Sequence, residues 1–481
     1  MIKLSPVLYV VGLLNAALGA AMAATAIYAA LAGGEDAGAF ALAAAATLFV
    51  AGALVLSNRG ERMELTPRQA FVLTVLAWVS ASGFAALPFV FSRDVGFTDA
   101  FFEAISGLTT TGSTVLTGLD DAPRALLLWR SLLQGMGGIG IIVMAIAILP
   151  FLQVGGMQLF KTESSDRTEK VLPRPGQTAA AIARVYVALI AICAVAYSAA
   201  GMDAFDAINH AMTTVATGGY STHDASIGYF ASAEVEVVGI AFMILGALPF
   251  VLYIRALQTG PEAVVRDPQV RAFLLMLGAA VAIAAIWLVL ARDETPLGAL
   301  RLAAFNIVSI ATTTGFASAD YNLWGPLPGV LFLLVMFMGG CSGSTSGAIK
   351  VFRFQVMIAA ARAHVSRLLH AHAVAPRSFG AMRISDEVVT SVAVFLGIYF
   401  VSVALLALIL AGFGLDLVTS VSSAVNALGN IGPGLGDVVG PAGNFASLPD
   451  GAKWALALGM LLGRLELMTV LVLFLPRFWR G

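Results

Sequence analysis

The chain alternates between long apolar runs and short polar interruptions. Runs such as ALAAAATLFVAGALVL (41–56) are almost wholly apolar, and several exceed the roughly 20 residues that a helix needs to cross a bilayer. The first two runs predict spanning helices at 7–32 and 39–57. The first run is long and only GGEDAG (33–38) separates it from the second, so we do not expect a cleaved signal peptide.

From about residue 69, one pattern repeats four times: a spanning helix, a short amphipathic helix, a break rich in Thr and Gly, and a second spanning helix. The long helices are predicted at 69–91 and 125–152, 178–200 and 233–257, 270–291 and 326–349, and 388–412 and 452–476. The short helices are predicted at 98–109, 203–215, 297–312 and 416–428. The pattern therefore predicts an all-α polytopic membrane protein with about ten spanning helices.

These repeats divide the chain into five parts. The expected divisions are 1–68 for the two N-terminal helices, 69–177 for repeat 1, 178–269 for repeat 2, 270–384 for repeat 3 and 385–481 for repeat 4. The short helices are too short to cross a bilayer, and their length suits segments that enter the membrane and leave on the same side.

The four breaks read LTTTGST (108–114), VATGGYS (215–221), IATTTGFASAD (310–320) and LGNIGPGLG (428–436). Non-helical backbone at membrane depth is tolerated only where it is buried in protein or lines a watery path. Four breaks that enter from one side therefore predict a shared axis. The expected central glycines are Gly112, Gly218, Gly315 and Gly432.

An extended loop can direct successive backbone carbonyls at such an axis. Four loops then form rings of oxygens that replace the hydration shell of a cation, and glycine allows the backbone angles that turn the carbonyls inward. The breaks thus predict an ion selectivity filter. The candidate ion-binding residues are Thr110, Thr111, Gly112, Ala216, Thr217, Gly218, Thr313, Thr314, Gly315, Asn430, Ile431 and Gly432.

Composition narrows the function further. The chain is 59% hydrophobic and 11% charged, and its longest polar segments, 153–177 and 353–387, are too short for a soluble domain. The net charge of −1 excludes a nucleic-acid partner. Cys193 and Cys341 lie in apolar or glycine-rich contexts, so no disulfide framework is implied. We see no nucleophile–base constellation and expect neither an enzyme nor a bound cofactor.

Charge also predicts the topology. Placing the N-terminus in the cytoplasm, with every break entering from outside, puts most of the 27 Lys and Arg residues inside. The acidic residues then gather outside, where they either concentrate cations at the mouth or simply solvate the loops.

Two further features fall within spans. GGCSGSTSG (339–347) is either a flexible intramembrane loop or a close helix contact of the Gly-x-x-x-Gly kind. Arg464 lies midway along the last span, where a charge is a functional-site hypothesis. Glu466 faces elsewhere on that helix and is a poor partner for Arg464. We expect Lys350 and Arg353 to mark the inner membrane face.

Three motif matches are better explained structurally. GMGGIG (135–140) lies within continuous membrane helix, so helix packing is a better account than a dinucleotide site. GSTSG lacks the Gly-Lys-Ser/Thr ending of a phosphate-binding loop. His364, His370 and His372 are interpreted as part of a basic linker rather than a metal site.

Seven stretches together carry a family resemblance: FFEAISGLTTTGST, WRSLLQGMGGIGIIVMAIAILP, TTVATGGYST, TTTGF, GGCSGSTSGAIKVFR, NALGNIGPGLG and GRLELMTVLVLF. They resemble the bacterial Trk/Ktr potassium-uptake family, which is related to plant and fungal HKT/TRK transporters. The two N-terminal helices resemble the TrkH branch. The resemblance implies potassium uptake across the bacterial inner membrane, a pseudo-fourfold pore within one chain, and a homodimer. In this family glycine in all four loops goes with potassium selectivity, and serine in the first loop goes with sodium transport in some plant relatives.

The resemblance also implies a gate and a partner. It makes Gly339, Gly340, Cys341, Ser342, Gly343, Ser344, Thr345, Ser346 and Gly347 a loop that obstructs the ion path, and it directs Arg464 toward that loop from below the filter. It further implies a cytoplasmic TrkA-like ring of nucleotide-binding subunits. The basic residues proposed to receive the ring, or alternatively to contact membrane lipid, are Lys161, Arg167, Lys170, Arg174, Arg353, Arg362, Arg367, Arg377 and Arg383.

A second function stays open on the sequence. Secondary transporters of small organic solutes also use broken helices at the membrane midplane. Their inverted repeats place breaks on both sides, whereas the four breaks here are expected to enter from one side, which favours the pore.

Overall fold

The computed structural model describes residues 3–60, 65–93, 95–147, 175–370, 377–380 and 382–480. Within these ranges the regular secondary structure is helical apart from two short antiparallel strands, β1 (Ser378–Phe379) and β2 (Met382–Arg383). Among the described residues, seven helices are long and apolar enough to span a membrane, or up to nine spans if two sharply bent helix pairs are each counted as one. The all-α membrane class is therefore confirmed.

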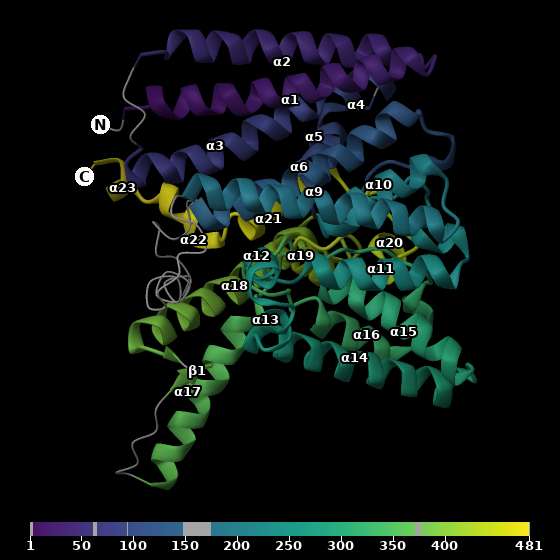
Figure 1. The fold of residues 1–481 in the computed structure, drawn as a ribbon, viewed down its shortest axis with the longest axis vertical. Helices are drawn as coiled ribbons and strands as arrows, with labels where there is room; N and C mark the ends of the chain where they lie inside the picture. The colour runs from purple at the N-terminus through teal and green to yellow at the C-terminus, as the bar shows by residue number, and fades with distance from the viewer. Residues whose placement is uncertain are drawn as a thin grey trace.

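The two N-terminal helices form an antiparallel pair at one edge of the molecule (Figure 1). They are α1 (Ser5–Leu31) and α2 (Ala37–Ser57), close to their predicted bounds. α1 also packs against α3 (Pro67–Ala85), which α4 (Leu87–Arg93) continues. Both chain termini lie at the same end of the bundle, and the turn between α1 and α2 lies at the other.

The four repeats follow in chain order. Repeat 1 adds α5 (Phe97–Leu108), η1 (Leu119–Asp121) and α6 (Arg124–Ala147). Repeat 2 contains α9 (Pro175–Ala199), α10 (Ala204–Val215), η2 (Ser226–Phe230), α11 (Ala233–Gly246), α12 (Phe250–Thr259) and α13 (Glu262–Val265). Repeat 3 contains α14 (Pro268–Arg292), α15 (Pro296–Ala311), η3 (Tyr321–Trp324), α16 (Pro326–Val335) and α17 (Val351–Leu369). Repeat 4 contains α18 (Asp386–Gly412), α19 (Leu417–Gly429), α20 (Gly436–Val439), α21 (Asp450–Arg464), α22 (Leu467–Leu471), η4 (Val472–Phe474) and α23 (Pro476–Arg480).

The four short helices α5, α10, α15 and α19 match their predicted bounds to within one residue. Three of them begin at a side chain that accepts a backbone N–H of the first turn: Asp203, Thr295 and Asp416. Such caps satisfy donors that a helix start leaves free. The C-terminal half of each short helix is buried, so these helices end inside the protein.

Three predicted long helices are interrupted, and these predictions were wrong. The span at 233–257 bends by 91° between α11 and α12, where Pro249 precedes α12 and lacks the N–H that a helix interior needs. The span at 326–349 stops at Val335, before the glycine-rich stretch. The span at 452–476 bends by 112° after α21, where Glu466 has a left-handed backbone. The end of the predicted helix 125–152 lies outside the described residues.

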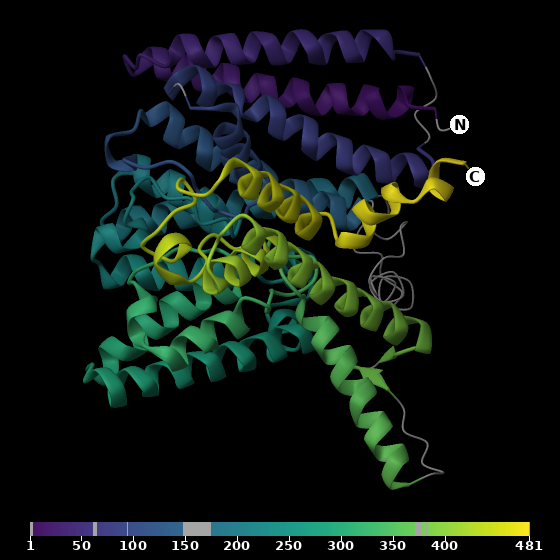
Figure 2. The same ribbon diagram turned by 180° about the vertical axis from the view of Figure 1, so that it is seen from behind.

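Helix α17 occupies part of the segment that was interpreted as a polar linker. Its first turn, Val351 to Arg353, is buried, whereas its C-terminal turns are exposed. Figure 2 shows it projecting from the body of the molecule beside β1 and β2. The stretch was missed because its basic residues mask an ordinary helical pattern.

The interpretation of GMGGIG as a packing motif is confirmed. α6 runs through it without interruption. A Cβ at Gly137 would overlap the carbonyl of Leu108, the last residue of α5, and a Cβ at Gly138 would lie 3.0 Å from the Cβ of Ala216. These glycines let α6 approach the ends of two short helices.

We predict that Gly137→Ala lowers the stability of the folded protein by roughly 1–3 kcal/mol, because the added methyl group overpacks this contact. Gly140→Ala is the matched control, since its Cβ would meet nothing closer than Trp78 at 3.8 Å. Alanine is the better helix former by about 1 kcal/mol, so the control should be neutral or stabilising. Thermal unfolding in detergent measures both. Equal effects of the two variants would contradict the packing assignment.

Candidate ion pathway

The same backbone turn closes all four short helices. One residue in each break has a left-handed backbone: Thr110 (φ 52°), Thr217 (φ 50°), Thr313 (φ 62°) and Asn430 (φ 52°). The residue after it donates its N–H to a carbonyl five positions earlier. These donor–acceptor pairs are Thr111 and Ser106, Gly218 and Thr213, Thr314 and Ser309, and Ile431 and Asn426, at 2.8 to 3.1 Å. A left-handed residue is uncommon outside glycine, so its fourfold recurrence shows that the breaks are structurally equivalent.

This equivalence corrects the register of the second loop. The third position of each loop is Gly112, Gly219, Gly315 and Gly432, and the first three of these have φ between 75° and 87°. Gly219, not Gly218, therefore corresponds to Gly112, and Ala216 lies before the loop as the C-cap of α10. The sequence VATGGYS contains two adjacent glycines, and only the turn decides between them.

The four loops form a closed ring in chain order. A Cβ at Gly112 would overlap the Gly218 carbonyl, and one at Gly219 would overlap the Thr314 carbonyl. A Cβ at Gly315 would lie 2.7 Å from the Gly432 nitrogen, and one at Gly432 would lie 3.3 Å from the Gly112 oxygen. Each loop thus contacts the next, and the fourth contacts the first. The structure brings the predicted filter residues together at one place, where their polar side chains are buried.

The electrostatics of the ring suit a cation. The C-terminal ends of α5, α10, α15 and α19 lead directly into the loops. The C-terminus of a helix carries a partial negative charge from its aligned peptide dipoles. Four such ends converge on one small region, so a positive ion there is stabilised without a carboxylate.

Part of the acidic face near the loops is occupied by an ion-pair cluster. His223 lies between Asp120 of η1 at 2.6 Å and Asp206 of α10 at 3.1 Å. The hydrogen bond from His223 is the main cause that lowers the pKa of Asp120. These carboxylates hold the segments after the first two loops together, so they are not simply solvated charges.

The glycine-rich stretch after α16 is a loop and not a helix contact. Gly339 and Ile349 form a backbone hydrogen bond of 2.9 Å across its base. Thr345 donates to the Gly246 carbonyl at 2.9 Å and contacts the Thr217 hydroxyl at 3.1 Å. The loop therefore lies against the C-terminal end of α11 and the second loop of the ring. The alternative of a packed Gly-x-x-x-Gly helix is wrong, because the stretch has no helical turn.

The same loop, with Ala348 directly after it, also contacts the third and fourth breaks. The Gly347 N–H donates to the Thr313 hydroxyl at 2.8 Å, and the Ala348 N–H donates to the Gly429 carbonyl at 2.9 Å. The loop thus bonds to repeats 2, 3 and 4 just beneath the ring.

Arg464 and Lys350 both reach this loop. Arg464, at the end of α21 and 3% exposed, donates to the Thr345 carbonyl at 2.8 Å. Lys350 donates to the Ser346 carbonyl. A small pocket is lined by both cations together with residues of the loop, Asn430 and Glu466. Lys350 was expected at the membrane face, and the structure places it against the loop instead.

Glu466 pairs with Arg353 rather than with Arg464. The Arg353 Nη2 to Glu466 Oε2 distance is 2.6 Å, and Arg353 is 1% exposed above the ring of Phe395 at 3.6 Å. The expectation that Glu466 is not the partner of Arg464 is confirmed. Arg353 is buried, so the expectation that it marks the membrane face was wrong. The pair joins the start of α17 to the break between α21 and α22.

Sequence reasoning missed a second set of buried polar residues behind the ring. Glu103 of α5, Arg130 and Gln134 of α6 are each at most 1% exposed and bond to the first two loops. A charge in FFEAIS and another in LLWRSLLQ were the available signals. The sequence alone does not predict that they form an ion pair, because Glu103 and Arg130 are 27 positions apart.

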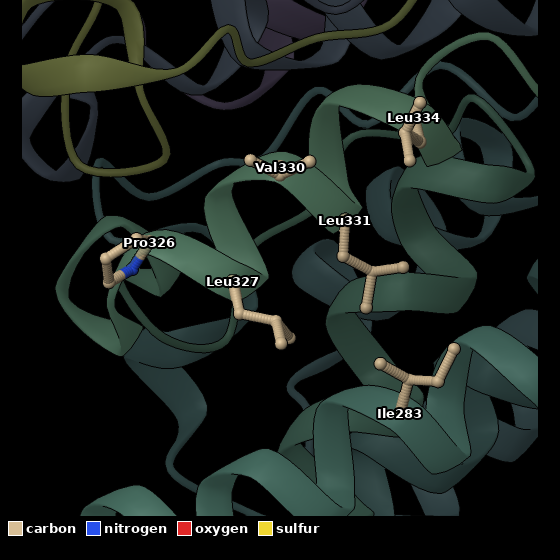
Figure 3. Close-up of a pocket in the computed structure, with 6 residues that line it drawn as sticks. All are labelled: Ile283, Pro326, Leu327, Val330, Leu331 and Leu334. Carbon is tan, nitrogen blue, oxygen red and sulfur yellow. The ribbon is translucent and has the colours of Figure 1, made fainter.

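One groove outside this region is apolar (Figure 3). Ile283 of α14 and five residues of α16 line it: Pro326, Leu327, Val330, Leu331 and Leu334. A solute site needs a few convergent polar groups that fix orientation, and none of these side chains supplies one. Among the described residues, no group of three or more His, Cys, Asp or Glu could hold a metal. His364 and His370 lie on or just after exposed α17, and His372 lies outside the described residues.

Comparison with known proteins identifies the family. The model of the TrkH cation transport proteins matches residues 37–480. The chain belongs to the TrkH family. Its relatives include the Trk system potassium uptake protein TrkI of Halomonas elongata, 49% identical over 87% of this chain and 85% of that protein. They also include a TrkH of the same organism, 42% identical over 92% of each chain.

A solved structure agrees with the fold. The crystal structure of the potassium transporter TrkH from Vibrio parahaemolyticus is 36% identical, with a TM-score of 0.92 over the full length of both chains. TrkH proteins are transport proteins, so the expectation that this chain is not an enzyme is confirmed.

Proposed function

We propose that this chain carries potassium ions into a bacterial cell through the ring of four loops. The closed contact of Gly112, Gly219, Gly315 and Gly432 carries the proposal, since it gathers four carbonyl-bearing strands around one axis. The relatives named as potassium uptake proteins support it. The protein would lie in the inner membrane with its N-terminus in the cytoplasm, so that the short helices enter from outside and lipid contacts the exposed apolar side chains.

The proposed filter is uneven around the axis. Its corrected loops read Thr-Thr-Gly, Thr-Gly-Gly, Thr-Thr-Gly and Asn-Ile-Gly. In the fourth, the Asn430 amide donates to the Met460 carbonyl at 2.8 Å and to the Thr111 hydroxyl at 3.0 Å, so it fixes the loop to its neighbours. A ring with unequal members should select less strictly than four identical strands.

Transport of organic solutes is the weaker alternative. The four breaks share one turn and one direction, whereas inverted repeats would present breaks from both sides. Purified protein in liposomes should carry K⁺ faster than Na⁺, and the chain should restore growth of an uptake-deficient bacterium at limiting K⁺. Absence of cation flux from well-folded protein would reject the pore.

In the same liposomes, Gly112→Ser should lower the K⁺ to Na⁺ flux ratio several-fold. A side chain there meets the Gly218 carbonyl and displaces the second loop, which changes how carbonyls replace hydration water. Gly118→Ser is the matched control, because Gly118 also has positive φ (68°) but a Cβ there would contact nothing within 4 Å. An unchanged K⁺ to Na⁺ flux ratio in Gly112→Ser would contradict the assignment of Gly112 to the filter.

The loop 339–347 is proposed to be the gate. Its hydrogen bonds through Thr345, Gly347 and Arg464, next to the ring, support this proposal. Glycine and serine give it small side chains, and it has no helical backbone hydrogen bonds that a movement would have to break. Arg464 and Lys350 add positive charge at the obstruction, which raises the barrier for a cation.

Arg464→Ala, or deletion of part of 340–346, should raise basal K⁺ flux several-fold and leave the K⁺ to Na⁺ ratio nearly unchanged. The loop loses an anchor and the path loses a positive charge, whereas the ring keeps its bonds. Arg477→Ala, an exposed cation on α23, is the control and should behave as the parent protein. Reduced flux from a well-folded Arg464→Ala protein would show that the loop is not an obstruction.

A homodimer bound to a cytoplasmic ring of nucleotide-binding subunits is proposed as the working assembly. Helix α17 projects from the body and carries Arg362 and Arg367 at exposed positions. It begins at Val351, shortly after the proposed gate loop. Arg353 is excluded from the residues proposed to receive the ring, because it is buried and forms an ion pair with Glu466. Arg377 contacts Asp386 at 2.5 Å, and Arg383 is exposed. Lys161, Arg167, Lys170 and Arg174 lie outside the described residues.

Pull-down from the native cell should recover such a ring protein, and ATP or NADH should change K⁺ flux only when the ring is present. Arg362→Glu with Arg367→Glu should weaken this binding, since both charges reverse on one helix. Arg266→Glu, an exposed cation paired within its own segment, is the control. Nucleotide that never alters flux in the reconstituted complex would refute regulation by a ring.

A further inference from the structure

A buried ion pair lies behind the first two loops of the ring. Arg130 Nε and Glu103 Oε1 are 2.8 Å apart, and the two side chains are 1% and 0% exposed. Two charges removed from water need both their mutual contact and further hydrogen bonds to offset the lost hydration. The remaining bonds of this pair therefore show what it holds.

Glu103 holds the first loop. Its two carboxylate oxygens each lie 3.0 Å from the Thr114 hydroxyl, and Oε2 accepts the Val115 N–H at 3.0 Å. The Arg130 Nη2 also donates to the Thr114 hydroxyl at 3.3 Å. Thr114 and Val115 follow Gly112 by two and three residues. The carboxylate thus fixes the strand that leaves the ring.

Arg130 holds the second loop at the same time. Its Nη1 donates to the Ser221 carbonyl at 2.7 Å, and its guanidinium lies 4.1 Å from the centre of the Tyr220 ring. The Tyr220 hydroxyl donates to the Glu103 carbonyl at 2.8 Å. The planar guanidinium therefore spans both loops, which the single ammonium of lysine cannot do.

Gln134 extends this contact toward the axis. It follows Arg130 by four residues, so both side chains lie on one face of α6. Its amide donates to the Gly218 carbonyl at 2.7 Å and accepts the Tyr220 N–H at 3.1 Å. Gly218 is also the residue whose carbonyl contacts Gly112 of the neighbouring loop. One helix face therefore reaches the point where loops 1 and 2 touch.

Loops 3 and 4 are held differently. Asn306 donates to the Ser318 hydroxyl at 3.0 Å, and Ser309 donates to the Phe316 carbonyl at 2.7 Å. In repeat 4, Asn426 donates to the Gly432 carbonyl at 2.5 Å. These are neutral groups of the short helices themselves. Charge-assisted hydrogen bonds are about twice as strong as neutral ones, so the ionic contact at loops 1 and 2 is the stiffest support in the ring.

We propose that Glu103, Arg130 and Gln134 are positioning residues that set the separation of the first two loops and thereby the preference for K⁺ over Na⁺. We name these three residues the loop clamp. The proposal rests on the potassium function proposed above. A ring that can contract around the smaller Na⁺ binds it better, and a stiff support on one side opposes this contraction.

The test measures the K⁺ to Na⁺ permeability ratio of the full chain in liposomes. This ratio does not depend on how much protein folds, so a merely structural role would leave it unmoved. Arg130→Lys keeps the charge and loses the fork, Glu103→Gln keeps the shape and loses the charge, and Gln134→Leu removes only the bonds to the second loop. Each should lower the ratio several-fold, with Glu103→Gln at least as damaging as Gln134→Leu.

Asp99→Asn is the matched control. Asp99 also lies on α5 and forms a mostly buried ion pair, with Lys453 at 2.6 Å, but its partner belongs to α21 and not to a loop. Its ratio should equal that of the parent protein. Gln134→Leu leaves no unpaired charge, so it decides the matter if the Arg130→Lys and Glu103→Gln variants do not fold. An unchanged ratio in folded Gln134→Leu, or an equal shift in Asp99→Asn, would overturn the clamp. A parent protein that does not prefer K⁺ would instead reject the proposed function.

Discussion

The whole structure depends on satisfying backbone polar groups where the chain leaves the helix at membrane depth. An unpaired N–H or carbonyl there costs several kcal/mol. The same turn solves this problem four times, with the left-handed Thr110, Thr217, Thr313 and Asn430 each followed by an N–H that bonds back into the short helix. The carbonyls beyond that turn are then available to neighbours, which is why the four loops can form a ring.

Close approach is the second requirement, and glycine on the following long helix provides it. Gly137 faces the Leu108 carbonyl, Gly246 faces the Val215 carbonyl and Gly463 faces the Leu428 carbonyl, with no room for a side chain at any of them. Each contact presses a long helix against the end of a short one. In the third repeat the long helix is missing beyond Val335, and the glycine-rich loop takes its place. The proposed gate therefore occupies, in one repeat, the place that a long helix has in the other three.

Sequence reasoning recovered the features that local chemistry encodes. Asp203 and Asp416 indicate where two short helices begin, and amphipathic patterns predict the bounds of the short helices to within one residue. It failed where an outcome depends on distant residues. Hydropathy cannot report the 112° bend after Arg464, and two adjacent glycines in VATGGYS leave the register undecided until the turn is seen. The ion pairs of Arg130 and Arg353 join residues 27 and 113 positions apart, so each charge was visible and its partner was not.

One chain that supplies all four quarters can give each a separate task. A tetramer of identical subunits must place the same side chain at every equivalent position, whereas here Glu103, Arg130 and Gln134 support the first two loops only. The third repeat has a loop where the others have a helix. The fourth repeat supplies Arg464, which bonds to this loop, and Glu466, which pairs with Arg353 at the start of α17. Ionic support thus lies at the first two loops, whereas the glycine-rich loop bonds to the second, third and fourth repeats. If the loop is the gate proposed above, a motion of α17 would shift it through Lys350 while the bonds of the clamp stay in place, so opening would not alter selectivity.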